Sequence, residues 1–328
     1  MRKNDDVMKN VLEECSHAKT IAIGGHIRPD GDCVGSCMGL YLYLKKTLPG
    51  VTVDVFLEKP RDIFNCIQNV DLIKNAEEYK EHTPYDVFFV LDCNLDRLGA
   101  SKEIFDKAKK RVNIDHHISN TGCGDVNYIM PQASSTSELI YDLTDSRFYD
   151  IEIAKALYIG IIHDTGVFQY SNTSQSTLQA AGQLISYGFD FPKLIDETFF
   201  EKTYIQNQIL GRALLESILF MDGKCIASVI DKKGMDFYGV TSADLDGIVN
   251  QLRYTKGVDC AIFLYEVEPL CYKVSLRSGG LVDVASVAQY FDGGGHVRAA
   301  GCTMNGTSYD VINNLSNQIA KQLENNES

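Results

Sequence analysis

Short apolar runs alternate with longer segments of helical periodicity in the first half of the chain. Four of the runs, at residues 20–23, 51–57, 85–91 and 111–114, have the length and composition of buried strands. The run at 85–91 is apolar almost throughout, which is typical of parallel sheets covered on both faces. Strands separated by helices predict an α/β fold with a doubly wound, mainly parallel sheet.

The segments between these runs have the spacing of apolar residues that helices require. Residues 34–47 are the clearest case, because Leu40, Leu44 and Leu48 follow one another at intervals of one helical turn. Further helices are expected at residues 135–145, 151–162 and 175–187. Residues 194–220 also have a largely helical pattern and are expected to connect two domains.

From residue 224 onward the pattern changes to short alternating strands mixed with helices. Strands are expected at residues 225–230, 260–267 and 271–277, and helices at 242–254, 282–291 and 309–323. The sequence therefore predicts a smaller α+β domain after the first one. The expected division is a first domain at 1–188, a helical linker at 189–222 and a second domain at 223–328.

The composition is that of a globular protein with two domains. A chain of 328 residues is long enough for two hydrophobic cores, and 45% of its residues are hydrophobic. Its 31 basic and 44 acidic residues give a formal net charge of −13. A surface that follows long nucleic acids is normally basic, so this charge argues against long polymers but not against short anionic substrates.

The cysteines and the N-terminal segment indicate the compartment. Ten cysteines are scattered along the chain without a Cys-x-x-Cys motif, and Cys33 and Cys37 lie one helical turn apart. No apolar stretch is long enough to span a membrane, and the first twenty residues are too polar for a signal peptide. We therefore expect reduced core thiols in a cytoplasmic protein that does not enter a membrane.

Polar side chains that could bind a metal follow several of the predicted strands. They are His26, Asp30 and Asp32 after the first strand, Asp92 after the third, Asp115, His116 and His117 after the fourth, and Asp164 at the end of a helix. The carboxyl ends of parallel strands share one edge of the sheet, where open α/β sheets bind ligands. Two structural alternatives remain: Asp32 as a helix N-cap beside a hydrogen-bonded His26, and residues 115–117 as a corner with satisfied hydrogen bonds.

The donor set indicates the kind of metal. Without Asp115 and His117 the candidates are two imidazoles and four carboxylates, which would neutralise two divalent cations. Asp92 is the natural bridge between them because it follows a central strand. Oxygen-rich ligation with two histidines suits Mn²⁺, with Mg²⁺ as the alternative ion. Such a pair of ions lowers the pKa of a bound water and stabilises both oxygens of a phosphoryl displacement.

A second group of candidates lies towards the C-terminus. Residues 275–278 read SLRS and residues 293–301 read GGGHVRAAG. Glycines expose backbone N–H groups to an anion, and His296 and Arg277 add positive charge. The alternative interpretation of the glycine run is a flexible turn between a helix and a strand.

The motifs HIRPDGD, VLD, DHH and HDTG, in this order, resemble the four motifs of the DHH phosphoesterases. SLRS and GGGHVRAAG resemble the DHH-associated C-terminal domain of the first type. The resemblance implies a catalytic DHH domain and a substrate-binding domain, with the active site in the cleft between them. It also implies a homodimer through the first domain.

The resemblance also implies a role for each candidate residue. One Mn²⁺ would be held by His26, Asp30 and Asp92, and the other by Asp32, Asp92, His116 and Asp164. His117 would contact the scissile phosphate, and Asp115 would orient the ligand histidines by hydrogen bonding. The substrate would be bound by Arg277, Gly294, Gly295 and His296.

Within the family, the chain resembles in its length the compact nanoRNases that also act as pAp phosphatases. This implies hydrolysis of short oligoribonucleotides, of the 3′-5′ exonuclease type, and of 3′-phosphoadenosine 5′-phosphate (pAp). A phosphodiesterase for pApA or cyclic di-AMP is the second interpretation. A nucleotide-binding regulator without turnover is the third, and the complete ligand set argues against it. Two departures from the family pattern, Asp292 and His163, bear on substrate preference.

Overall fold

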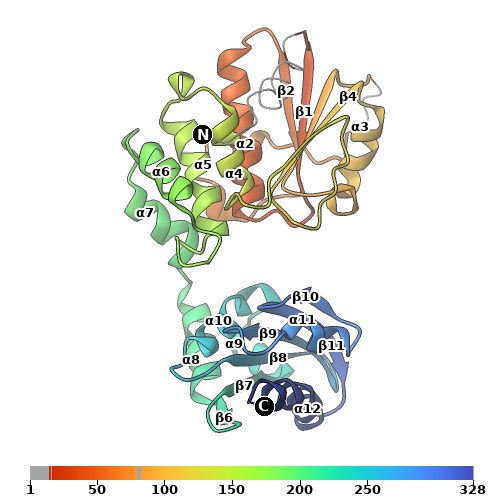
Figure 1. Cartoon of the computed structure of the whole chain (residues 1–328), viewed down its shortest axis with the longest axis vertical. Coiled ribbons are helices and arrows are strands. Elements are labelled where there is room, and N and C mark those ends of the chain that lie inside the picture. Colours follow the sequence, from red (N-terminus) through yellow and green to blue (C-terminus); the bar gives the residue numbers. More distant parts are fainter. Residues whose placement is uncertain (1–14, 16, 80–82, 328) are drawn as a thin grey trace. The chain divides into compact units, whose positions relative to one another are not determined.

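The computed structural model describes residue 15 and residues 17–79 and 83–327, with side chains as far as residue 324. Contacts divide the chain into two units, Met1–Glu201 and Lys202–Ser328. Each unit has its own sheet and its own hydrophobic core (Figure 1). The boundary falls inside the segment 189–222, which was predicted to be a helical linker.

The described residues of the first unit form a parallel sheet with the strand order β2-β1-β3-β4-β5. The strands are β1 (Thr20–Gly24), β2 (Thr52–Phe56), β3 (Val87–Leu91), β4 (Lys110–Asp115) and β5 (Val126–Ile129). The predicted fold class is confirmed. The chain leaves β1 and β3 towards opposite edges of the sheet, so a switch point that can hold a ligand lies between their carboxyl ends.

One face of this sheet is covered by α2 (Gly31–Thr47), α4 (Thr136–Leu143) and α5 (Ile151–Asp164) (Figure 1). The short helix α3 (Lys102–Lys107) packs on the other face. The helix α6 (Gln175–Ile185) packs on α5. A Cβ atom at Gly35 would lie 2.6 Å from the carbonyl oxygen of Ala156, so this glycine allows α2 to cross α5 at close range.

Two details of the first unit were not predicted. The strand β5 escaped prediction because its four residues include Asn127 and lie at the edge of the sheet, where the apolar run is short. Helices were expected between all the strands. However, between β2 and β3 the described residues form only the 3-10 turns η1 (Asp62–Phe64) and η2 (Val70–Leu72).

The predicted helical stretch at 194–220 is wrong in two places. The chain forms α7 (Phe191–Ile195), a π-turn (Asp196–Phe200) and then a separate helix α8 (Tyr204–Leu215), followed by the strand β6 (Ile218–Phe220). Thr203 starts α8 because its hydroxyl accepts from Gln206 N at 3.2 Å, while Thr203 N donates to the Gln206 side chain at 2.9 Å. This capping box breaks the helix next to the boundary between the two units.

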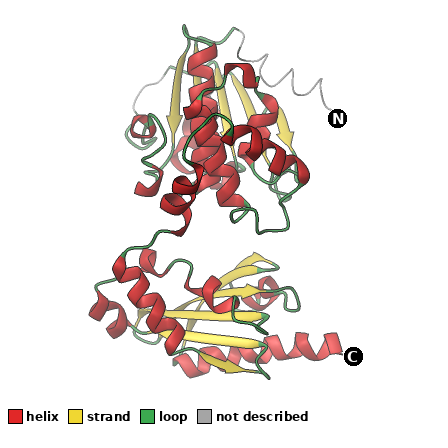
Figure 2. Cartoon of the chain, turned by 90° about the vertical axis from the view of Figure 1, so that its left-hand side faces the viewer, coloured by secondary structure: helices red, strands yellow, loops and turns green. Residues whose placement is uncertain are grey.

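The described residues of the second unit form a mixed sheet with the order β10-β11-β9-β8-β7-β6. Its further strands are β7 (Cys225–Ile230), β8 (Cys260–Glu268), β9 (Cys271–Ser278), β10 (Gly294–His296) and β11 (Ala299–Asn305). One face is covered by α8, α9 (Lys232–Tyr238) and α10 (Ile248–Arg253), and the other by α11 (Val284–Gln289) and α12 (Ser308–Glu327) (Figure 2). The predicted α+β domain is confirmed.

The described chain offers no helix with the length and apolar character needed to cross a bilayer. No disulfide joins the ten cysteines, all of which belong to the described residues. Cys33, Cys37 and Cys93 are buried in the first unit, and Cys225 and Cys260 are buried in the second.

Candidate metal centre

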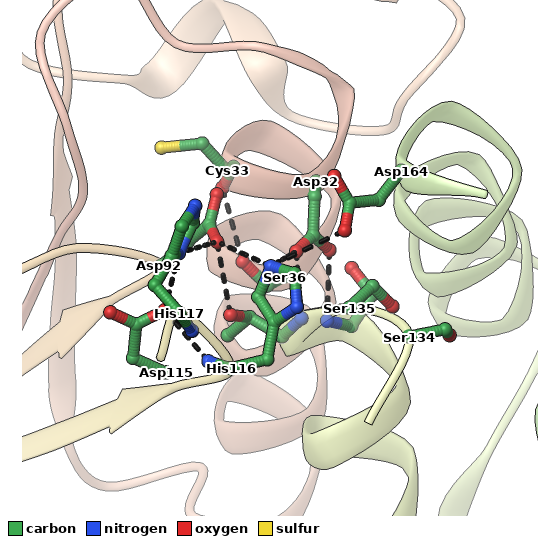
Figure 3. Close-up of polar contacts among 12 residues, drawn as sticks. Asp32, Cys33, Ser36, Asp92, Asp115, His116, His117, Ser134, Ser135 and Asp164 are labelled. Atoms are coloured by element: carbon green, nitrogen blue, oxygen red, sulfur yellow. Dashed lines mark hydrogen bonds and ion pairs between the residues drawn. The ribbon is translucent and has the colours of Figure 1, made fainter. Parts of the chain in front are cut away.

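The polar residues that follow the predicted strands converge at the carboxyl edge of the first sheet (Figure 3). His26 lies just beyond β1, and its Nε2 atom is 3.4 Å from Asp92 Oδ2 and 3.6 Å from Asp30 Oδ1. Asp92 follows β3, which neighbours β1 in the sheet. The expected switch point is therefore where these three side chains meet.

A second group of donors lies around His116, just beyond β4. Its Nε2 atom is 3.5 Å from Asp92 Oδ1, 3.3 Å from Asp164 Oδ2 and 3.9 Å from Asp32 Oδ2. Asp92 thus has one carboxylate oxygen facing each histidine. The structure brings together all six residues that were predicted as ligands.

The separations within both groups fit donors that share a cation. At 3.3–3.9 Å they are too long for charge-assisted hydrogen bonds. Two donors that each bind one ion at about 2.1 Å, at right angles to one another, are about 3 Å apart. A cation between the donors would therefore need only a small adjustment of the side chains.

The histidine nitrogens provide the test of whether a metal fits. The Nδ1 atom of His26 lies 2.9 Å from the carbonyl oxygen of Ile27, which can only accept, so Nδ1 carries a proton and Nε2 is the atom that faces the carboxylates. The Nε2 atom of His116 is buried and has no hydrogen-bond partner among the described residues. Lone pairs aimed at carboxylates are unfavourable unless a cation or a proton lies between them.

The electrostatics of the cluster also favour a bound cation. Burial raises the pKa of Asp164 to about 7 and raises the pKa of Asp32, with the charge of Asp92 adding to both effects. Burial lowers the pKa of His116, but Asp92, Asp164 and Asp32 outweigh it and raise the pKa to about 10. The cluster holds more negative charge than it can neutralise, and divalent cations would remove the imbalance.

Asp92 is held in an uncommon backbone conformation. Its φ of 60° lies in the left-handed region, which aspartate tolerates better than most residues. Its backbone N–H donates to Ile114 O at 3.1 Å, and the hydroxyl of Thr136 donates to its Oδ1 at 3.1 Å. Local strain of this kind concentrates at functional sites, where the surrounding structure enforces it.

The N-cap interpretation of Asp32 is wrong. The N-cap of α2 is Asp30, whose carboxylate accepts from Asp32 N and Cys33 N at 3.1 Å each. Asp32 instead accepts from Thr136 N at 2.7 Å and Ser137 N at 2.9 Å, at the start of α4. These two N–H groups orient Asp32 towards His116.

The DHH segment combines a hydrogen-bonded corner with two part-buried rings. One oxygen of the buried Asp115 accepts from His116 N at 2.7 Å, His117 N at 3.0 Å and His117 Nδ1 at 2.8 Å. Its other oxygen accepts from Asn120 at 2.6 Å. Asp115 therefore orients the ring of His117 directly and His116 through its backbone. The corner explains Asp115, but it leaves His116 Nε2 without a hydrogen-bond partner among the described residues.

Two family models match the chain: the DHH family N-terminal domain at residues 20–161 and the DHHA1 domain at residues 222–325. The bifunctional oligoribonuclease and PAP phosphatase NrnA of Thermus thermophilus is 30% identical over 88% of this chain and 86% of its own length. The chain belongs to the DHH family. The histidines and carboxylates of this DHH protein include groups of donors that lie close enough together to hold a divalent metal ion.

Solved structures share the fold. An exopolyphosphatase-related protein from Bacteroides fragilis matches with a TM-score of 0.91 and 24% identity, covering 100% of both chains. RecJ of Thermus thermophilus, in complex with Mn²⁺, matches with a TM-score of 0.50 and 11% identity, covering 96% of this chain and 54% of RecJ.

A network that the sequence analysis missed fixes the start of α4. The carboxylate of Glu138 is fully buried and accepts from Ser134 N at 2.9 Å, Ser134 Oγ at 2.6 Å, Ser176 Oγ at 2.8 Å and Thr177 Oγ1 at 2.9 Å. It thereby fixes the start of α4, where Thr136 donates hydrogen bonds to Asp32 and Asp92. The signal in the sequence was the polar run 134–138 at the start of an apolar helix.

We expect Glu138→Gln to loosen the metal site of the DHH domain without touching a ligand. The amide retains the size of the side chain but replaces one acceptor oxygen with a donor, which faces hydroxyl or N–H groups. Metal affinity should fall about 10- to 100-fold, the usual effect of removing a ligand's supporting hydrogen bonds. A Mn²⁺ titration measures this. Glu103→Gln, at an exposed position of α3, is the control; equal affinities in both variants would contradict the assignment.

The predicted substrate residues lie together in the second unit of this DHH protein. Arg277 on β9 pairs with Ala299 on β11, which pairs with His296 on β10, so Arg277 and His296 share a face of the sheet. Arg277 donates from Nε to Asn250 Oδ1 and from Nη1 to Leu276 O, each at 2.9 Å. Asn250 was not singled out in the sequence.

The glycine run forms a strand, so the flexible-turn interpretation is wrong. Gly294–His296 pair with β11 as one side of a hairpin, and their side-chain positions are exposed. A Cβ at Gly295 would lie 2.5 Å from Ala299 O, and its φ of 147° also requires glycine. Asp292 has a φ of 57°, a conformation that glycine would adopt without strain, so this departure preserves the local backbone.

The other departure, His163, belongs to the packing of the first unit. Its ring lies between Phe64 and Phe199, with ring centroids 5.2 and 5.4 Å away. Burial, together with the charge of Arg61, lowers the pKa of His163 to about 4, so the ring is neutral. Its Nε2 atom is buried without a hydrogen-bond partner among the described residues.

Proposed function

We propose that this protein is a manganese-dependent phosphoesterase that hydrolyses short oligoribonucleotides from the 3′ end and also hydrolyses pAp. The observation that carries the proposal is the placement of Asp92, with its two carboxylate oxygens facing two separate histidines. The similarity to relatives named as oligoribonuclease and PAP phosphatase supports the choice of substrate.

We assign one Mn²⁺ to His26, Asp30 and Asp92, and the other to Asp32, Asp92, His116 and Asp164, with Mg²⁺ as the alternative ion. When bound, the two cations supply an activated water and charge stabilisation for the phosphoryl group. The chain orients the donors through the N–H groups of Thr136 and Ser137 and through the Ile27 carbonyl group.

We assign His117 to the scissile phosphate. Its hydrogen bond to Asp115 raises the pKa of the imidazole, and this outweighs the lowering effect of burial. The raised pKa favours the charged ring. With Nδ1–H donating to Asp115, the Nε2–H of the charged ring is available to a phosphate oxygen. The ring is part-buried, so this contact would be only partly screened by water.

We assign catalysis to residues 1–188 and substrate binding to residues 223–328, through Arg277, Gly294, Gly295 and His296. Arg277 and His296 would bind a second phosphate of the substrate, and Asn250 holds the guanidinium in place. We also propose a cytoplasmic location and a homodimer through the first unit.

We expect Arg277→Ala to raise KM for short substrates about 10- to 100-fold, because it removes a charge-assisted contact worth roughly 1.5–3 kcal/mol. Metal affinity should not change. Lys273→Ala is the matched control, since Lys273 is an exposed cation four residues earlier on the same face of β9. Steady-state kinetics on a dinucleotide measures the effect, and an equal rise in KM in both variants would show only a general effect of charge.

A substrate panel with Mn²⁺ tests the proposed function. It should contain pAp, RNAs of two to five nucleotides, a twenty-nucleotide RNA, pApA, cyclic di-AMP and pyrophosphate. We expect turnover of pAp and the shortest RNAs, with a steep fall in rate as length increases. A strong preference for pApA or cyclic di-AMP would identify a signalling phosphodiesterase. Binding of nucleotides without hydrolysis would identify a regulator.

A further inference from the structure

A cysteine lies among the donors around His26. The Cys33 sulfur, a nitrogen of His26 and a carboxylate oxygen of Asp92 lie within 4.8 Å of one another. All three residues are buried, and Cys33 is fully inaccessible to solvent. Figure 3 shows Cys33 at the start of the helix that also carries Asp32. From the sequence alone, this thiol is expected to be a reduced core residue.

The backbone around the thiol leaves room for the sulfur. Gly25 immediately precedes His26, and any side chain there would collide with the sulfur of Cys33. The sulfur of Cys37, one helical turn further along α2, would lie 3.4 Å from the same Cβ position. Both thiols therefore pack against Gly25, but only Cys33 lies within the donor group of His26 and Asp92.

The two groups of donors differ in chemistry. Around His116 the donors are imidazoles and carboxylates, a set that suits Mn²⁺ and Mg²⁺. Around His26 the donors are an imidazole, carboxylates and a thiol. A thiolate favours softer ions such as Zn²⁺, Co²⁺ and Cd²⁺ over Mn²⁺. The Nε2 atom of His26 is directed at the carboxylates because Nδ1 is bound to the Ile27 carbonyl oxygen.

We propose that Cys33 is a further metal ligand beside His26 and Asp92, and that this position takes a thiophilic divalent cation such as Zn²⁺ or Co²⁺ in preference to Mn²⁺. The inference rests on the proposed metal centre and adds a specificity to one of its two positions. On binding, the thiol proton leaves to solvent and the sulfur donates an electron pair to the cation. The position around His116 remains one for a harder ion.

Cobalt gives a readout that does not depend on activity. A Co²⁺–thiolate bond produces an intense charge-transfer absorption in the near ultraviolet, whereas nitrogen and oxygen ligands do not. The metal-free protein, Cys33→Ala and Cys37→Ala should each be titrated with Co²⁺ while this absorption is followed. Cys37→Ala is the matched control, because it removes an equally buried thiol one turn away on the same helix.

We expect the charge-transfer band in the native protein and in Cys37→Ala, and no band in Cys33→Ala. The affinity for Zn²⁺, measured by competition with a chromophoric chelator, should fall at least about tenfold in Cys33→Ala, while the affinity for Mn²⁺ should change less than about twofold. Thermal unfolding of the metal-free variants shows whether each is folded. If Cys33→Ala is not folded, Cys33→Ser provides the same test with a side chain of similar size.

Stoichiometric Co²⁺ binding without a charge-transfer band would overturn the inference and leave the metal centre intact. A band that persists in Cys33→Ala would also overturn it. If none of Mn²⁺, Co²⁺ and Zn²⁺ binds to the native protein, the proposed metal centre itself fails, and this inference fails with it.

Discussion

Asp92→Asn is expected to abolish phosphoesterase activity while leaving the protein folded. Among the described residues, Asp92 is the one carboxylate that faces both histidines, at 3.4 Å from His26 Nε2 and 3.5 Å from His116 Nε2. Asparagine has the same shape and tolerates the left-handed backbone of this position, so the loop should be preserved. It lacks the charge and one of the two oxygens on which both groups of donors converge.

The expected loss in kcat/KM is large. The charge stabilisation that metal ions supply in phosphoryl transfer is several kcal/mol, which corresponds to a rate loss on the order of 10³-fold or more. The rate should be measured at saturating Mn²⁺ on a dinucleotide. Asp96→Asn is the control, because Asp96 is an exposed carboxylate four residues further along the chain. Turnover close to that of the control would contradict the role of Asp92 as the shared ligand.

His116→Ala and His117→Ala are expected to fail in different ways, although the two residues are adjacent. The ring nitrogen of His116 lies among three carboxylates and has no hydrogen-bond partner among the described residues. The ring of His117 is held by Asp115 instead. The first substitution should lower metal affinity, and excess Mn²⁺ should partly restore activity.

The second substitution should leave metal content unchanged and lower kcat about 10²- to 10³-fold, the usual effect of losing one donor to a developing charge. Metal content and kcat, measured on the same preparations, separate the two effects. Equal loss of metal in both variants would show that His117 is a ligand. Equal loss of kcat without loss of metal would show that His116 is not a ligand.

Most of the metal centre could be predicted because the topology of a parallel sheet is predictable. His26, Asp92 and His116 each follow a strand that its apolar run revealed, and carboxyl ends of parallel strands share one edge. Asp164 could be placed because it follows an apolar helix. The strand order and the packing of α5 on the sheet then bring together residues up to 138 positions apart, from His26 to Asp164.

The supporting contacts could not be predicted because they depend on packing between segments distant in sequence. Glu138 is a polar residue in a polar run, and its role arises only when the α4 and α6 segments meet. In the sequence Cys33 looks like any other cysteine of a hydrophobic core. Its sulfur can lie near His26 because Gly25 has no side chain there. The strand β10 contains no apolar side chain, so its pairing with β11 left no periodic signal.

The number of Mn²⁺ ions that the metal-free native protein binds tests most directly whether Asp92 is shared by two metal ions. Equilibrium dialysis against Mn²⁺, with metal and protein quantified in the same sample, gives this number without a substrate. We expect two ions per chain, because Asp92 faces two donor groups, and fewer than one tightly bound ion in Asp92→Asn. A native protein that binds no Mn²⁺, or an Asp92→Asn variant that still binds two ions with native affinity, would contradict this expectation.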